Sequence, residues 1–284
     1  MGLPSVDTEV HVVRINQNIG AFNAYRNLSV TNTAQGKSLE KLSSGFRINR
    51  AADDAAGLAR SEGLRAEIGG TKVAIRNAQD GISFVQTAEG ALEEVHAILQ
   101  RMRDLAVGAA NSTSDGSAEA DEIAQLQEEL TAIGQRTTFN GEKVFGQTAR
   151  FHVGAGADQT INSLTVDTSD LSAGSLGAST VSISAIDVTD DASAAAAIST
   201  LDQAIESVSK ERSKLGATQN RLEAAVRNLS VAAENLQAAE SRIRDTDMAE
   251  EMVEFTRHQI LQQAGTAMLA QANAAPQTVL ALLR

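Results

Sequence analysis

The chain has 284 residues, 42% of them hydrophobic, which is enough to bury a substantial core. Aromatic residues make up only 3% and there are two prolines, a composition typical of long helices with narrow apolar seams. A net charge of −12 argues against nucleic-acid binding, because phosphate contacts need clustered Lys and Arg. The absence of cysteine excludes disulfides and thiolate chemistry.

Neither a cleavable secretory signal nor membrane insertion is predicted. The first fifteen residues contain Asp7 and Glu9, where a signal needs a basic stretch followed by an apolar core. The longest uncharged run, at 258–283, is long enough to span a bilayer. Its five Gln residues, together with Asn273 and Pro276, would be costly in lipid.

Apolar residues between positions 85 and 133 step by three and four along the chain, which is the spacing of coiled-coil helices. A polar break, NSTSDGS at 111–117, has the composition of a turn. We therefore predict two helices joined by a loop. The first tract comprises Val85, Ala88, Leu92, Val95, Leu99, Met102, Ala106 and Ala109, and the second comprises Ile123, Leu126, Leu130 and Ile133.

A third tract lies between positions 201 and 243, with breaks at Arg212 and Gln219. Its members are Leu201, Ile205, Val208, Leu215, Leu222, Ala225, Leu229, Ala232, Leu236, Ala239 and Ile243. Separated tracts most simply bury their seams against each other. Between them, at about 139–191, short β-branched runs such as LTVDTS alternate with Gly, Ser and Asp. We predict a mainly α fold: a long antiparallel coiled coil or helical bundle, with the N- and C-terminal helices paired and a small β element at the tip.

The two chain ends predict assembly, whereas the heptads alone fit a self-contained bundle equally well. No residue between positions 14 and 26 is charged, and none between 257 and 284 apart from His258. The apolar residues of the C-terminal helix lie on two faces, one with Val253, Ile260, Ala264 and Met268, the other with Met248, Met252 and Phe255. Other copies of the chain could cover both faces through heterologous contacts that build an open helical filament.

Six stretches of the chain are distinctive: RINQNIGAFNAYRNL at 14–28, LSSGFRINRAADDAAGLARSEGLR at 42–65, QRMRDLAVGAANST at 100–113, TTFNGEKVF at 137–145, ESRIRDTDMAEEM at 240–252 and the terminal VLALLR. They resemble the motifs of bacterial flagellins, in the order in which flagellins carry them.

This resemblance implies a secreted subunit of the extracellular flagellar filament, with terminal helices in an inner tube and the next helices in an outer tube. It divides the chain into a leader at 1–13 outside the family pattern, an inner-tube domain of 14–55 with 244–284, and an outer domain of 56–243. The leader would be a misassigned start or a tag. The short tip implies a plain filament without large outer domains.

The resemblance also implies partners and contact residues. The chain would be exported unfolded through the flagellar type III export apparatus with an export chaperone, and would meet the cap and hook-junction proteins. Gly45 would permit a turn between inner and outer helices, where charged residues could pair across subunits or, alternatively, be solvated on a flexible linker. The polymerisation candidates are Ile15, Ile19, Phe22, Arg47, Arg50, Asp53, Asp54, Val253, Phe255, Ile260, Met268, Leu280, Leu282 and Leu283.

Flagellins of many bacteria are detected by the Toll-like flagellin receptor. The resemblance places the corresponding patch at Arg101, Leu105 and Glu122. The alternative is that Leu105 stabilises the filament and Arg101 makes a surface ion pair worth about 0–1 kcal/mol. The C-terminal leucines match the region sensed by cytosolic inflammasome receptors.

Other functions are less well supported. The histidines at 11, 96, 152 and 258 form no HExxH pair, and GAGADQ at 154–159 fails the GxGxxG pattern, so neither catalysis nor a cofactor is predicted. The hook–filament junction protein shares both terminal regions and is the alternative function, although QRMRDLAV, TTFNG and the short tip favour a filament subunit. A cytoplasmic signalling coiled coil would keep charges at its ends.

Overall fold

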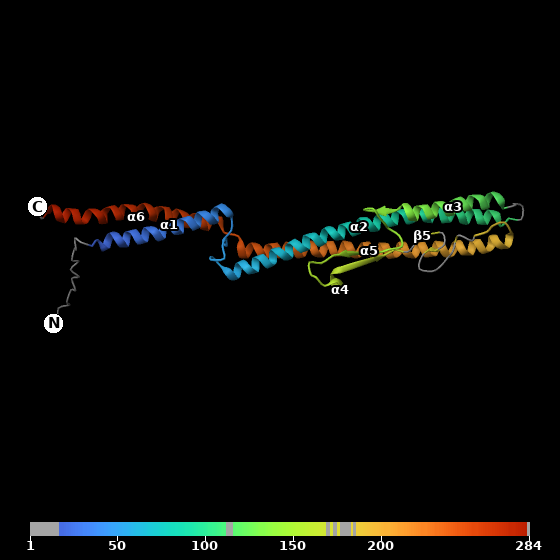
Figure 1. Ribbon diagram of the computed structural model, residues 1–284, viewed down its shortest axis with the longest axis horizontal. Coiled ribbons are helices and arrows are strands. Elements are labelled where there is room, and N and C mark those ends of the chain that lie inside the picture. Colours follow the sequence, from blue (N-terminus) through green and yellow to red (C-terminus); the bar gives the residue numbers. More distant parts are fainter. Residues whose placement is uncertain are drawn as a thin grey trace. The chain divides into compact units, whose positions relative to one another are not determined.

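The computed structural model describes residues 17–111, 116–168, 171–172, 175–176, 183 and 186–282, without the side chains of 171–172, 175–176, 191 and 278–282. Its main helices are α1 (Ile19–Ser44), α2 (Ala55–Ala109), α3 (Ser117–Arg136), α5 (Asp191–Arg244) and α6 (Met248–Leu282) (Figure 1). The predicted leader, Ile15, Leu283, residues 112–115 of the predicted turn and part of the predicted β region lie outside this description. The mainly α fold is confirmed.

The contacts divide the chain into two units, one of residues 1–63 with 238–284 and the other of residues 64–237. Helices α2 and α5 pass from one unit into the other. No helix in the described part of the chain is both long enough and apolar enough to cross a membrane.

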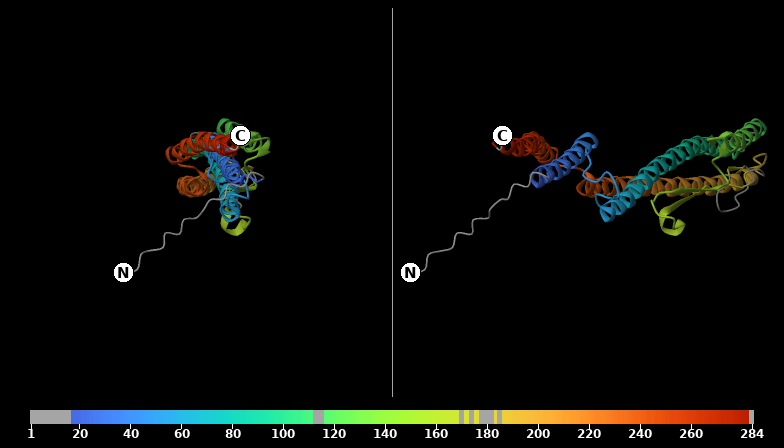
Figure 2. Two further views of the ribbon diagram at one scale, coloured as in Figure 1. Left: turned by 90° about the vertical axis from the view of Figure 1, so that its left-hand side faces the viewer. Right: turned by 60° about the vertical axis from the view of Figure 1, so that its left-hand side comes forward.

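The larger unit is built on α2 and α5, which run antiparallel. Arg103 Nε lies 2.6 Å from Asp202 Oδ1, and Arg212 lies 3.8 Å from Glu89, so the end of α2 faces the start of α5. All eight residues of the first predicted tract are buried between the helices, none more than 6% exposed. Helix α3 lies beside α2 and buries Ile123 and Leu130, both of them predicted (Figures 1 and 2).

Beyond Leu222 the predicted α5 seam, from Ala225 to Ile243, is only half-buried. Before Leu222 the observed seam differs from the predicted one at two points. It passes through Ala204 rather than Ile205, which is only partly buried at its flank, and it continues through Glu211, where a break was predicted nearby. The buried positions still step by three and four, at 201, 204, 208, 211 and 215. Packing against the partner helix therefore decides which positions are buried, whatever the size or polarity of the residue there. Glu211 is 7% exposed and pairs with Lys214 Nζ at 2.7 Å.

We expect Glu211→Leu to raise the free energy of unfolding of the larger unit by about 1 kcal/mol, because a buried carboxylate is often no better than apolar packing at the same position even when it has an ion-pair partner. Lys214 is 64% exposed and would return to water without cost. Glu206 makes a similar pair with Lys210 on the exposed face, so Glu206→Leu is the matched control and should change stability little. Urea unfolding followed by circular dichroism measures both, and a clear loss of stability in Glu211→Leu would contradict the prediction.

The small β element lies against α2. An Asn140–Gly141 turn, with both residues at positive φ, joins β1 (Thr138–Phe139) to β2 (Glu142–Lys143). The strand β3 (Thr148–His152) pairs antiparallel with β4 (Ser163–Asp167) around the short helix α4 (Gln159–Asn162), and β5 (Leu171–Ser172) pairs with β6 (Ser175–Leu176). Asn77 of α2 donates a hydrogen bond to the carbonyl of His152 at 3.0 Å, which fixes the β3–β4 hairpin to the helix.

Candidate assembly surface and linker joint

The predicted pairing of the N- and C-terminal helices is confirmed, since α1 and α6 lie side by side and antiparallel (Figures 1 and 2). Asn18 caps α1 by accepting a hydrogen bond from the amide of Ala21, and its side chain donates to the carbonyl of Ala272 at 2.6 Å. At the other end of the pair, Lys41 Nζ lies 3.2 Å from Glu251 Oε2. Only Ser38 of α1 is buried, so the pair encloses almost no core.

Large apolar side chains of this pair point into solvent. Five of the predicted polymerisation residues are between 60% and 78% exposed: Ile19, Phe22, Val253, Ile260 and Met268. Phe255 differs, because it is half-buried in the pair. Leu280 and Leu282 belong to α6, but the positions of their side chains are not described.

The exposed apolar surface is larger than the sequence indicated. One shallow groove on α6 is lined by Met252, Val253, Thr256, Arg257, Ile260 and Leu261. On α1, Tyr25, Val30 and Leu39 are also more than half exposed. Periodicity alone did not single them out, because α1 lacks a continuous apolar stripe. We call the exposed apolar residues of α1 and α6 the terminal surface.

Two linkers join this helix pair to α2 and α5, and they bind each other. Gly45 ends α1 in the left-handed region with φ 75°, where a side chain would be strained, so the predicted turn is confirmed. The amide of Arg47 donates to the carbonyl of Arg244 at 2.6 Å, and the amide of Thr246 donates to the carbonyl of Gly45 at 3.0 Å. These bonds flank an antiparallel bridge between Phe46 and Asp245. We call residues 45–54 with 244–247 the linker joint.

The four charged residues predicted in this region all have partners within the chain. Arg47 donates from its guanidinium to the carbonyl of Ile243 at 2.6 Å, and Arg50 Nε lies 2.9 Å from Glu40 Oε1. Asp53 and Asp54 instead accept from backbone amides, Asp53 from Arg50 at 3.0 Å and Asp54 from Gly57 at 2.8 Å. The segment is therefore an ordered loop in the structure, and pairing across subunits stays a prediction.

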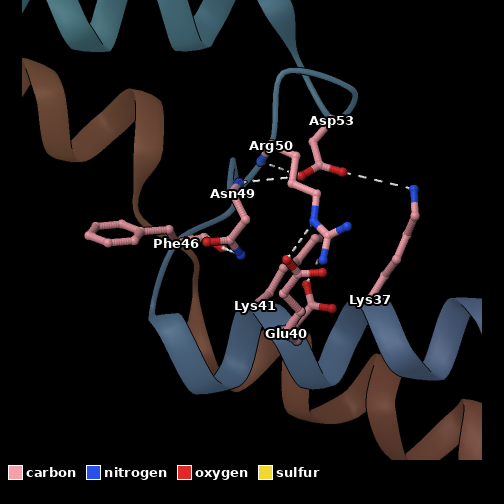
Figure 3. A network of polar contacts seen from close by, with 8 residues as sticks. Lys37, Glu40, Lys41, Phe46, Asn49, Arg50 and Asp53 are labelled. Carbon is pink, nitrogen blue, oxygen red and sulfur yellow. Dashed lines mark hydrogen bonds and ion pairs between the residues drawn. The ribbon is translucent and has the colours of Figure 1, made fainter.

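Figure 3 shows how these contacts fold the loop back over α1. Asp53 lies 3.8 Å from Lys37, and Arg50 reaches Glu40 one turn further along the same helix. The ring of Phe46 points away from this polar cluster. Ile48 is only 1% exposed and packs on the first turn of α2, where a Cβ on Gly57 would lie 2.8 Å from Ile48 Cδ1 and collide with the Asp54 carboxylate. Gly57 is therefore required for this close approach.

Acid should loosen the loop at Asp53. Hydrogen bonds from the backbone amides, chiefly that of Arg50, hold the pKa of Asp53 below its ordinary value of 3.8. Because the folded-state pKa is the lower one, the stabilisation is present above the unfolded-state value and is lost as pH falls through the folded-state value. We expect hydrogen exchange at Asn49 and Arg50, normalised to intrinsic rates, to accelerate below pH 3.8.

Asp53→Asn keeps the shape of the side chain and removes its titration, so it is the matched control for this prediction. Exchange in this variant should be faster at neutral pH and nearly independent of pH. A variant that keeps the acid-dependent profile of the parent would assign the effect to another group.

The predicted receptor residues lie in the larger unit. Arg101 of α2 and Glu122 of α3 are in contact, with Arg101 Nη2 2.8 Å from Glu122 Oε1 and both side chains exposed. Leu105 lies one turn further along α2 and is half-buried against the core. The structure therefore brings two of the three together on the surface, while Leu105 also contributes to packing.

Comparison with known proteins matches both helical regions. The family model for the bacterial flagellin N-terminal helical region matches residues 15–150, and that for the C-terminal helical region matches residues 198–283.

Several curated proteins are similar along nearly the whole chain. A flagellin of Halalkalibacterium halodurans is 53% identical over 276 residues, covering 95% of this chain and 99% of that protein. A flagellin of Bacillus subtilis is 49% identical, covering 96% and 100%. The flagellar filament 33 kDa core protein of Treponema phagedenis is 48% identical, covering 95% and 99%. With both family regions matched in order around one helical hairpin, the chain belongs to the bacterial flagellin family.

Proposed function

We infer that this chain is a structural subunit that polymerises into the bacterial flagellar filament, the propeller of motility. The observation that carries this function is the terminal surface. Its helices expose large apolar residues on a pair that buries only one residue of α1, whereas the predicted heptad tract of α2 in the larger unit is fully buried. Such an apolar surface on an otherwise well-packed chain is characteristic of a protein interface.

Other copies of the same chain are the occupants that fit this surface best. The outer ends of these helices carry no charged residue between Arg14 and Arg26 or between Arg257 and Arg284 apart from His258, so a charged partner would find few ion pairs there. Large apolar residues occur on both helices, and contacts through different faces of one subunit generate an open helical polymer when the rotation between subunits does not close a ring. The relatives reported above include a protein named for the filament core, and no observation favours the hook–filament junction alternative.

The same function implies where the chain acts and what it meets. We place it in the extracellular filament, exported unfolded by the flagellar type III apparatus with a chaperone and added beneath the cap at the growing tip. Contacts with the hook-junction proteins would occur at the filament base. A structural role leaves no need for a cofactor, and the family is one of structural proteins.

Electron microscopy of polymer grown from the purified protein tests this function. Seeds made by shearing the polymer should elongate into filaments of uniform diameter many subunits long. Assemblies that stop after a few subunits, or that add only to the ends of existing hooks, would support the junction protein instead. Failure to polymerise from seeds would contradict the filament function.

Recognition of the free monomer by the Toll-like flagellin receptor is a second proposal, supported by the exposed Arg101–Glu122 pair on α2 and α3. Arg101→Ala should weaken receptor activation more than tenfold, because alanine at a binding hot spot typically costs about 2 kcal/mol or more. Leu105→Ala should do the same but should also destabilise the larger unit, so Arg101→Ala is the cleaner test. Gln203→Glu, an exposed change on α5, serves as control in a reporter-cell assay. Unchanged dose–response curves for Arg101→Ala would contradict the proposal.

A further inference from the structure

We propose that the linker joint sets the register in which α1 pairs with α6, and that Arg244 is its positioning residue. This inference deepens the proposed function, because subunits can share a helical lattice only if their terminal helices pair in the same way. Only its consequence for the subunit lattice rests on the proposed function, since the register itself is a property of the single chain.

The α1–α6 pair has little of its own to specify a register. Only Ser38 of α1 is buried, and half-buried positions of α6 include the small or polar residues Gln262, Gly265 and Ala272. Large interlocking side chains normally penalise a slipped helix pair, and here the large ones in the contact, such as Phe255 and Leu269, are only half-buried. A slip by one turn would therefore cost little unless something outside the helices prevented it.

The joint can prevent it, because its register continues into the helix pair. The joint pairs Phe46 with Asp245 in an antiparallel bridge held by two backbone hydrogen bonds. Residues that face each other across the helix pair lie at nearly equal numbers of residues from this bridge along the two segments. The facing pairs are Lys41 with Glu251, Leu28 with Gly265, and Asn18 with Ala272. Both helices thus leave one fixed point, which raises the effective concentration of each for its partner in that register.

Arg244 ties together the parts of this joint. Its side chain is 12% exposed, its guanidinium carbon lies 4.9 Å from the centroid of the Phe46 ring, and its Nη1 lies 2.7 Å from Glu62 Oε1. Its carbonyl accepts the hydrogen bond from Arg47 that flanks the bridge. Because Arg244 Nε has no hydrogen-bond partner in the described part of the chain, the Phe46 ring and the Glu62 carboxylate must compensate the burial of this charge. One residue therefore connects the end of α5, the first linker and the second turn of α2.

The register can be measured because the chain contains no cysteine. An ideal Cβ on Gly265 lies 3.8 Å from the Cβ of Leu28, within the range of about 3.5–4.5 Å that a disulfide needs. Leu28→Cys with Gly265→Cys therefore reports the native register, and Leu28→Cys with Leu269→Cys reports a slip of one turn. Both pairs are equilibrated as full-length monomer in a glutathione redox buffer, and the disulfide fraction of each is quantified by peptide mass spectrometry.

We expect the native pair to dominate, and Arg244→Gln to lower the ratio of native to slipped disulfide about tenfold, the effect expected for losing one charge-assisted hydrogen bond. Phe46→Leu and Glu62→Gln should lower it less, in the same direction. Arg242→Gln removes an exposed positive charge two residues earlier and should leave the ratio unchanged. Far-UV circular dichroism checks that each variant keeps its helical content.

Equal ratios in Arg244→Gln and Arg242→Gln would overturn the assignment of Arg244. If the protein with an unaltered linker joint forms the native and slipped disulfides equally, the register mechanism as a whole is wrong. Neither result depends on polymerisation. If the unmodified protein forms no filament, the proposed function is contradicted, while the disulfide ratios still test the register mechanism by themselves.

Discussion

Ile260→Glu should abolish filament formation and leave the monomer folded. Ile260 is 60% exposed in the shallow groove of α6, so a carboxylate there is solvated in the free chain and costs it little. In the polymer the groove would be covered by another subunit, where an unpaired charge costs several kcal/mol. Because every subunit in the lattice carries the same penalty, polymerisation should fail even at high protein concentration.

Two further variants make the Ile260→Glu result specific. Ile260→Leu keeps an apolar side chain of the same size and should polymerise, while Gln203→Glu adds the same charge to an exposed position of α5 in the larger unit. Sedimentation after seeding measures polymer, and thermal unfolding measures the monomer. Normal filaments from Ile260→Glu would show that the groove is not a subunit interface.

The heptad seam of α2 could be predicted from the sequence because it is built of residues that differ sharply from their neighbours. Large apolar side chains such as Leu92, Leu99 and Met102 alternate with charged residues at regular spacing, and each is buried where the spacing places it. The Asn140–Gly141 turn is a similar case, since that dipeptide suits the positive φ of both residues. Local patterns of this kind need no knowledge of the partner segment.

The seam was missed where its residues are small or charged. It continues toward the start of α2 through Ala78 and Ala74, and in α5 through Ala204 and Glu211. Alanine occurs as often outside a seam as within it in this sequence, and a glutamate normally indicates solvent. Only the partner helix reveals that these positions are enclosed, because antiparallel packing keeps its spacing whatever residue stands there.

The linker joint lay beyond sequence reasoning for a different reason. Arg47, Arg50, Asp53 and Asp54 were identifiable as candidates, but their partners were not, since ion pairs and backbone bonds here join segments far apart in the chain. The contact between Arg244 and Glu62 spans 182 residues, and no motif links the two. Phe46 was the one available signal, as the only aromatic residue in a segment of Gly, Ala and charges.

The second large effect concerns the order of the terminal helices before and after assembly. Fixing a residue costs about 1–2 kcal/mol of backbone entropy, and α1 with α6 buries only Ser38 of α1 to offset it. Burial of the terminal surface against other subunits would supply the missing stabilisation, at about 25 cal/mol per Å² of apolar area. We therefore expect residues 19–43 and 248–282 to exchange their amide hydrogens rapidly in the monomer, where the two helices pair in the register of the linker joint only part of the time. Stable folding of these helices should then accompany polymerisation.

Hydrogen exchange by mass spectrometry on one preparation, before and after seeded polymerisation, tests this coupling between the terminal helices and assembly most directly. We expect peptides of α1 and α6 to change from nearly unprotected to strongly protected on polymerisation. Peptides covering the buried seam at 85–109 serve as the internal reference and should be protected in both states. Terminal helices that are equally protected in monomer and polymer, or that stay unprotected in the polymer, would contradict the coupling between their folding and assembly.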